Sequence, residues 1–377
     1  MKLIRFLYVF VYLLFYFFVL VSCGDNFEKN KSNNEIRIRL NSSTTSILLN
    51  YKVKNQTSSE RVWRNIKIKK KLTIGEIDDT LLLMPIKLRT DNKNNIYVLD
   101  QASKSVKKFN EKGKLIAQYG KNGKGPGEVI LPMSFDVSRN SDIVISDISL
   151  KRCVIFQGKN RFIVNLKYTP LGVCFISKND IAVLQCDDIR EFSNIERFNF
   201  SGELSHSYDR LVIINGSSKM KIIGPIPAFV GELYADKDGI YYLPKYMNHI
   251  IHYSNSGQIK YSNSTIDYLP LPMITKNVKK TANNLKIISG SANLPKEQLS
   301  YIISTIVEDY IIILSRRGTL EYNIPVFDFY SKNTGIYLFS IKFKELGQFV
   351  DLSFNKEHIY ILRPNMKIQV FDYKISK

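Results

Sequence analysis

Short apolar stretches recur through this chain, each opened by a polar residue, an aromatic residue or glycine and followed by turn residues. Their starts lie about 40 to 70 residues apart, which is close to the period of a four-stranded propeller blade lengthened in places by insertions. The six stretches are Asn95–Leu99, Asp142–Ser146, Asp180–Leu184, Gly239–Leu243, Tyr310–Leu314 and His358–Leu362. Six repeats of this kind predict six blades.

The residues around each stretch predict the other strands of a blade. A second apolar run follows after about ten residues, as in Ser105–Asn110, and a Gly-containing turn such as Phe109–Gly113 leads to an outer strand. A further strand precedes each stretch, as at Ser134–Val137, and would line the central channel. The predicted fold is all-β, a six-bladed β-propeller of four-stranded antiparallel blades.

Closure of the ring needs a strand from the N-terminal part of the chain, because the last repeat ends after its third strand. The segment Ile66–Ile74 alternates partly between apolar and polar residues, as a strand with one covered face does. It would remove an exposed sheet edge. Ile36–Leu40 and Ile47–Tyr51 are alternative closing strands, and we place Ile66–Ile74 first because it is nearest to the first blade.

The second repeat resembles a known propeller repeat. Its Gly-rich run Tyr119–Glu128 is followed by Pro132, by Phe135–Val137 and by Asp142–Asp147, in the order and spacing of NHL-type repeats. The whole chain is most similar to the six-bladed propeller lipoproteins of Gram-negative bacteria. The resemblance implies a fold and not an activity, because a propeller is a scaffold for binding and for several chemistries.

The N-terminus has the pattern of a lipoprotein signal. Lys2 and Arg5 precede the apolar run Phe6–Val21, and Leu20–Cys23 fits a lipobox with a small residue before the cleaved bond and a thiol after it. Cys23 is therefore the expected lipidation site, and acyl chains on it would attach the protein to a membrane. An uncleaved transmembrane anchor is the alternative, although the run is shorter than the roughly 20 residues that span a bilayer.

These patterns divide the chain into three parts. Residues 1–22 are the predicted signal peptide, residues 23–61 a polar linker that could add strands to the ring, and residues 62–377 the propeller. Asp25 and Glu28 follow Cys23 closely, in the place where some lipoproteins carry a surface-export signal. We expect attachment to the outer membrane, with the periplasmic or the external side left open, and a monomeric protein.

The chain carries a formal net charge of +20, and removal of the signal peptide leaves it strongly basic. This charge suits a negatively charged partner such as an acidic glycan or an anionic membrane face, although an AT-rich genome would produce the same bias. Nucleic acid is not expected, because the chain has neither a recognition helix motif nor an ordered basic and aromatic platform.

Metal and cofactor chemistry find little support. Beyond Cys23 the chain has three cysteines and no Cys-x-x-Cys, so we expect buried free thiols. His249 and His252 fall on opposite faces of one strand, and neither His206 nor His358 lies on an inner strand, so the histidines cannot converge on the axis. We predict no metal site and no cofactor.

The Gly-rich run Gly120–Gly127 lacks the Lys-Ser/Thr ending and the following helix of a phosphate-binding loop. We interpret it as a turn between blades. Lys121, Lys124 and Glu128 remain candidate ligand contacts at the mouth of the channel.

Three connections between blades are long, at Lys121–Met133, Arg210–Val230 and Thr265–Ser300, and in a propeller they all emerge on one face. Long loops of this kind are usually functional or disordered. The third is basic, and its candidate ligand contacts are Lys276, Lys279, Lys280 and Lys286. We expect this face to hold a partner site.

The leading prediction is a lipid-anchored propeller of the cell envelope that binds an envelope protein or an acidic glycan without catalysis. The alternative is a propeller-type lyase or hydrolase acting on a glycan or peptide at the central channel. An enzyme needs ionisable side chains with shifted pKa values around the axis. The inner strands Phe135–Val137 and Gly172–Phe175 are mainly apolar, which favours binding over catalysis.

Overall fold

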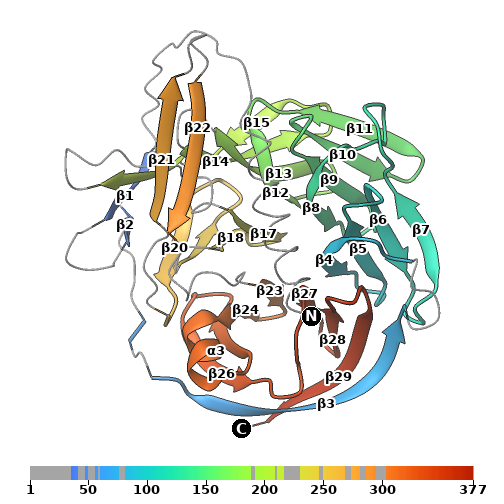
Figure 1. Ribbon diagram of the computed structural model, residues 1–377, viewed down its shortest axis with the longest axis vertical. Coiled ribbons are helices and arrows are strands. Elements are labelled where there is room, and N and C mark those ends of the chain that lie inside the picture. The colour runs from blue at the N-terminus through green and yellow to red at the C-terminus, as the bar shows by residue number, and fades with distance from the viewer. Residues whose placement is uncertain are drawn as a thin grey trace.

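The protein is a ring of six β-sheets arranged around a central axis (Figure 1). The computed structural model describes residues 35–40, 47–49, 56–57, 60–75, 81–187, 192–208, 210–215, 230–245, 249–267, 273–280, 286–293 and 303–376. The predicted signal peptide, Cys23, Asp25 and Glu28 lie outside the described residues. The six apolar stretches of the sequence are all second strands of blades, which confirms the predicted six-bladed, four-stranded antiparallel fold.

The first two blades are regular. Blade 1 contains, from the axis outward, β4 (Pro85–Thr90), β5 (Ile96–Asp100), β6 (Ser105–Phe109) and β7 (Leu115–Tyr119). Blade 2 contains β8 (Pro132–Val137), β9 (Ile143–Asp147), β10 (Arg152–Gln157) and β11 (Asn160–Asn165).

Blade 3 is widened at its outer edge. It contains β12 (Thr169–Phe175), β13 (Asp180–Asp187), β14 (Phe192–Asn199) and β15 (Leu204–Ser207). β14 also pairs with β16 (Arg210–Asn215), which is followed in the sheet by β1 (Glu35–Leu40) and β2 (Ile47–Leu49). β1 pairs in parallel with β16, so the two alternative closing strands of the sequence extend blade 3 and do not close the ring. Residues 210–215, expected in a loop, form a strand because they pair with this edge.

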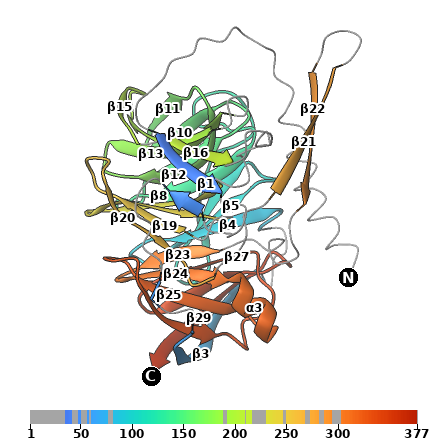
Figure 2. The same cartoon turned by 90° about the vertical axis from the view of Figure 1, so that its left-hand side faces the viewer.

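Blade 4 contains β17 (Gly231–Asp236), β18 (Gly239–Pro244), β19 (His249–Tyr253) and β20 (Ile259–Ser264). Blade 5 contains β23 (Ser304–Val307), β24 (Tyr310–Ser315), β25 (Val326–Ser331) and β26 (Tyr337–Lys342), with the short helix α3 (Arg316–Tyr322) between its second and third strands. Between these two blades the connection predicted as a long loop contains the hairpin β21 (Met273–Lys280) and β22 (Lys286–Asn293). Figure 2 shows this hairpin at one face of the ring, outside the stacked blades.

Blade 6 is built from both ends of the chain. It contains β27 (Asp351–Phe354), β28 (His358–Leu362), β29 (Ile368–Ser376) and, as its outer strand, β3 (Trp63–Ile74). β3 pairs antiparallel with β29 from Ile74 opposite Ile368 to Asn65 opposite Ser376, which confirms the predicted closing segment. Its first residues also pair in parallel with β26, so β3 joins blades 5 and 6 along the rim (Figure 1).

Apolar side chains fill the interfaces between neighbouring blades. Second and third strands are buried on both faces, as in β5 and β28, because each blade is covered by the one before and the one after it. The largest cluster joins blades 5 and 6 and includes Phe327, Phe343 and Phe354. Burial of this kind, at roughly 25 cal/mol per Å² of apolar surface, is the main stabilising contribution to the fold.

Candidate functional site

Four inner strands and the residue after β18 bring a group of charged side chains together, which we call the axial cluster: Lys87, Arg89, Asp136, Glu232, Lys245 and Asp351. At its centre one oxygen of Glu232 lies 2.6 Å from the Lys87 ammonium and 2.5 Å from the Arg89 guanidinium. The other oxygen lies 3.0 Å from Lys245 Nζ. One carboxylate therefore holds three cations that come from blades 1 and 4.

The other two carboxylates of the axial cluster accept hydrogen bonds from the backbone of neighbouring blades. Asp351 on β27 accepts from the Leu88 amide at 2.7 Å, and Asp136 on β8 accepts from the Phe175 amide at 2.9 Å. Each bond joins an inner strand to the inner strand of the next blade. The cluster thus links the blades around the axis.

Burial and charge shift the pKa values of the axial cluster. Burial lowers the pKa of Lys87 to about 8, since the pull of Glu232 does not fully offset it and Arg89 and Lys245 lower it further. The three cations hold the pKa of Glu232 well below its usual range although burial acts in the opposite direction. Burial raises the pKa of Asp136 and of Asp351.

The axial cluster corrects the prediction of mainly apolar inner strands. Phe135 and Val173 do point into the interfaces between blades, but the alternate positions of the inner strands face the axis and carry charge. The sequence indicates this by charged residues next to an apolar one. Lys87 and Arg89 flank Leu88, and Glu232 precedes Leu233. The shifted pKa values are those that an enzyme site would have, yet the cluster's charges are paired with one another.

The Gly-rich loop between blades 1 and 2 is held by its own contacts. One oxygen of Glu128 accepts from the Gly125 amide at 2.7 Å, and the other lies 3.3 Å from Lys121 Nζ. The guanidinium of Arg152 donates to the carbonyls of Lys124, Gly125 and Glu128. The loop is therefore an ordered turn between blades, and Lys121, Lys124 and Glu128 lie together in it.

The predicted contacts Lys276, Lys279, Lys280 and Lys286 all fall on the hairpin β21–β22. In its register Lys280 pairs with Lys286 and Lys276 pairs with Gly290. Strand alternation then gives Lys276, Lys280 and Lys286 positions on one face and Lys279 a position on the other. The hairpin therefore brings these four positions together on one pair of strands.

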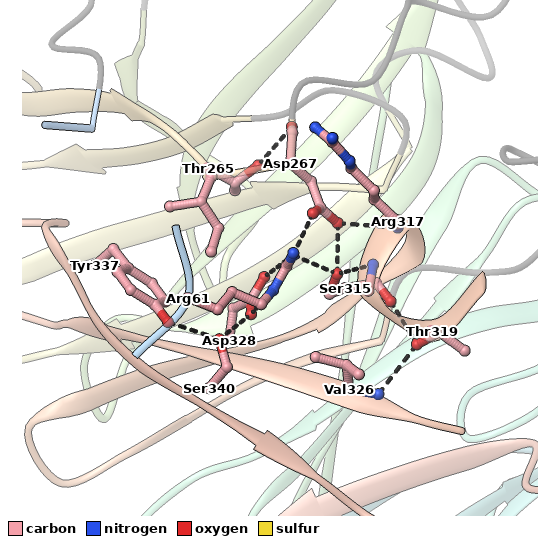
Figure 3. Close-up of polar contacts among 12 residues, drawn as sticks. Arg61, Thr265, Asp267, Ser315, Arg317, Thr319, Val326, Asp328, Tyr337 and Ser340 are labelled. Atoms are coloured by element: carbon pink, nitrogen blue, oxygen red, sulfur yellow. Dashed lines mark hydrogen bonds and ion pairs between the residues drawn. The ribbon is translucent and has the colours of Figure 1, made fainter. Parts of the chain in front are cut away.

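A second polar cluster fixes the N-terminal segment to blades 4 and 5, and we call it the clamp: Arg61, Asp267, Ser315, Asp328 and Ser340 (Figure 3). Arg61 donates to both oxygens of Asp328, at 3.0 and 3.1 Å, to Ser315 Oγ at 2.7 Å and to Asp267. Asp267 also accepts from Ser315 Oγ at 2.7 Å and from the Arg317 amide. Five hydrogen-bonding groups from three distant parts of the chain meet here.

The clamp is buried, and this shifts its ionisation. Side chains of Arg61, Asp267 and Asp328 are 8%, 6% and 2% exposed. Burial and the nearby charge of Asp267 raise the pKa of Asp328 to about 6, against the opposite effect of Arg61. The clamp could not be predicted from the sequence because Arg61 is more than 200 residues away from Asp267 and Asp328 in the chain.

Among the described residues no group of three His, Cys, Asp or Glu side chains could hold a metal ion. In that part of the chain no helix has the length and apolar character to cross a membrane. Cys153, Cys174 and Cys186 are buried, and none of these three forms a disulfide bond.

Comparison with known proteins agrees with this architecture. Residues 76–290, more than half of the chain, match the DUF5128 family, described as a 6-bladed beta-propeller, and the chain belongs to this family. No curated protein matches the sequence.

Solved structures share the fold. A Bacteroides fragilis protein described as exported aligns with a TM-score of 0.54 and 13% identity over 91% of this chain and 99% of that chain. Virginiamycin B lyase from Staphylococcus aureus aligns with a TM-score of 0.47 and 13% identity, over 81% and 99%. BamB from Moraxella catarrhalis aligns with a TM-score of 0.41 and 10% identity, over 81% and 100%. At such identities the likeness extends to the fold alone.

Proposed function

We propose that this protein is a lipid-anchored, non-catalytic binding module of the cell envelope, attached to the outer membrane through Cys23. The observation that supports the proposal is that the carboxylates of the axial cluster already have partners within the ring. Glu232 is held by three cations, and Asp136 and Asp351 accept backbone hydrogen bonds, so the axial groups serve the ring itself. A working site is then expected on a face of the ring and not inside it.

The hairpin β21–β22 is the best candidate for that site. It is added to the blade architecture and stands outside the stacked blades (Figure 2). Its four lysine positions suit an acidic glycan or an acidic surface of an envelope protein, because charge complementarity speeds encounter and selects partners. Lys121, Lys124 and Glu128 are a weaker candidate, since their loop is occupied by its own bonds.

The binding experiment uses residues 23–377 with Cys23→Ser, which include every described residue. Polygalacturonate and neutral dextran are titrated at low and high salt, with the melting temperature and calorimetric binding as readouts. We expect polygalacturonate alone to bind, with an affinity that falls as salt rises. Release of shortened glycan during the titration would contradict a non-catalytic role.

A charge-reversal pair of variants locates the site. Lys276→Glu with Lys280→Glu and Lys286→Glu should lose binding. The matched control reverses three exposed lysines of turns in blades 1 and 2: Lys112, Lys114 and Lys159. Equal loss in both variants would show that only net charge matters and would remove the hairpin from the proposal.

The anchor is tested separately in cells. Cys23→Ser should move the protein out of the membrane fraction and abolish its labelling by a fatty-acid analogue, whereas Cys153→Ser should change neither. Unchanged labelling of the Cys23 variant would contradict a lipid anchor at this residue.

A channel enzyme is the second candidate, and one observation favours it. Lys87 on the axis has its pKa lowered to about 8, so it is in part an uncharged amine near neutral pH and could act as a base. If a glycan or peptide is cleaved by the wild-type chain and not by Lys87→Met, the enzyme proposal replaces the binding module.

A further inference from the structure

The outer rim of blade 6 carries an exposed basic surface that the proposed partner site does not use. The exposed residues of β3 include Lys67, Lys69 and Lys71, and Lys374 on β29 is also exposed. Ile66 and Ile68, at the alternate positions, pack into the interface with blade 5, so alternation turns Lys67 and Lys69 away from that interface. The register shifts at Lys71, and its ammonium lies 3.0 Å from Nε2 of the buried His358. We call Trp63, Lys67, Lys69, Lys71, Tyr322 and Lys374 the rim strip.

The arrangement of the lysines is costly for the fold itself. Lys67 and Lys374 lie directly opposite each other in the antiparallel ladder, where like charges are destabilising. Lys69 has Asp372 opposite it, and that carboxylate also lies 3.0 Å from His358 Nδ1. The strip thus presents more positive than negative charge, which an external anionic surface would neutralise.

One end of the rim strip is aromatic and apolar. Trp63 meets Tyr322 edge to face at 5.2 Å, and the Lys342 ammonium lies 4.1 Å from the Trp63 ring and 3.4 Å from the Tyr322 ring. Trp63 and Tyr322 are 37% and 36% exposed, and around them Val62, Leu320 and Leu338 are also exposed. Tryptophan and tyrosine with aliphatic side chains on one side and lysines on the other are typical of protein surfaces at a membrane interface.

We propose that the rim strip rests on the anionic headgroups of the membrane that holds the lipid anchor, with Trp63 and Tyr322 at the headgroup level. A lipid surface fits better than a glycan because it offers both phosphate for the lysines and an apolar layer for the exposed leucine, valine and tryptophan side chains. The ring then stands on its rim, and the face with the hairpin β21–β22 stays open to a partner. The proposal rests on the proposed anchor, because the tether makes weak rim contacts effective by raising their local concentration.

Trp63 is the single tryptophan of the chain, so its fluorescence reports on this surface directly. Residues 23–377 with Cys23→Ser are mixed with phosphatidylcholine vesicles that contain or lack phosphatidylglycerol. We expect co-sedimentation, a blue-shifted Trp63 emission and quenching by brominated lipid, with the phosphatidylglycerol vesicles only. Because the chain carries no acyl group, this result is independent of lipidation and of the hairpin site.

The rim variant Lys67→Glu with Lys69→Glu and Lys374→Glu should bind the anionic vesicles at least about 100-fold more weakly, since each lysine near such a surface contributes roughly a factor of five. The control with Lys112, Lys114 and Lys159 reversed should bind like wild type. Substitution by glutamine at the three rim positions keeps the test valid if the glutamate variant does not fold.

Three outcomes would overturn the proposal. One is an unchanged Trp63 emission with every vesicle, another is equal loss in the rim and control variants, and the third is a blue shift with polygalacturonate but not with vesicles. The first two leave the hairpin site untouched, whereas the third would place the glycan on the rim. Polygalacturonate binding to the hairpin variants tests the hairpin site by itself.

Discussion

The axial cluster and the clamp both place one central charged group among groups of the opposite charge, but the sign of the central charge differs. At the axis one carboxylate, Glu232, is surrounded by three cations, whereas in the clamp one guanidinium, Arg61, faces the two carboxylates Asp267 and Asp328. The cations lower the pKa of Glu232, and the second carboxylate helps to raise that of Asp328 to about 6. In each cluster one central charged group contacts several groups of the opposite sign.

The difference matters because carboxylates can take up a proton at mild pH and arginine does not lose one. The clamp can relieve its excess negative charge by protonating Asp328, so it responds to pH near 6. Glu232 stays ionised far below that pH. In this mildly acidic range the Glu232 contacts are therefore the more constant of the two connections, and the clamp the more adjustable one.

Removal of the central carboxylate should have the largest effect. Glu232→Gln leaves Lys87, Arg89 and Lys245 buried without their counter-ion, and we expect the free energy of unfolding to fall by about 4 kcal/mol. Denaturant unfolding at neutral pH measures it. Glu111→Gln, at an exposed turn, is the control, and a similar small change in both variants would mean that the axial charges are not coupled.

Removal of the central cation of the clamp comes next. Arg61→Ala leaves Asp267 and Asp328 facing each other, and we expect a loss of about 3 kcal/mol at pH 8. The loss should be smaller at pH 5, because Asp328 can then be neutral. The exposed Arg139→Ala is the control, and a loss in Arg61→Ala that does not depend on pH would contradict the charge arrangement of the clamp.

The pH dependence of Asp328 separates the two clusters further. Its pKa is raised from 3.8 to about 6 on folding, so the folded state binds this proton more tightly and the contribution to stability is lost as pH rises through about 6. Relative to Asp328→Asn, wild type should lose stability between pH 4 and 6. Glu232 has the opposite sign, since its lowered pKa stabilises the fold above pH 4.5 and this is lost in acid. Unfolding curves of Asp328→Asn and Glu232→Gln beside wild type measure how the free energy of unfolding contributed by each carboxylate changes with pH. Slopes of the same sign for the two carboxylates would contradict the comparison.

The smallest effect is expected next to the clamp. The Gln56 amide donates to the carbonyls of Ser264 and Gly335 and accepts from the Tyr337 amide. Gln56→Ala should cost about 1 kcal/mol, the usual net value of such bonds. Thermal unfolding beside the exposed Gln118→Ala measures it, and a loss as large as that of Arg61→Ala would mean that the Gln56 side chain holds this segment as strongly as the Arg61 charge does.

Local sequence patterns allowed the blades to be predicted. Each repeat contains a short run of consecutive apolar residues that forms the second strand, and Gly-containing turns such as Phe109–Gly113 lead to outer strands. The closing strand was predictable as well, since Ile66 and Ile68 alternate with lysines before the first blade. The clamp was not predictable, because no pattern in the residues next to Arg61 in the sequence indicates that it contacts Asp267 and Asp328. Lys87 and Arg89 were visible as charges inside a strand, and only the ring shows that they meet Glu232 from the opposite side.

Pairing of β3 with β29 has a consequence for how the protein is made. β29 lies between β28 and β3, so blade 6 cannot form until the chain has been synthesised as far as β29. Until then the edges of β3 and β28 that face β29 have no partner strand. The order of the strands in the chain therefore makes closure of the ring a late step of folding.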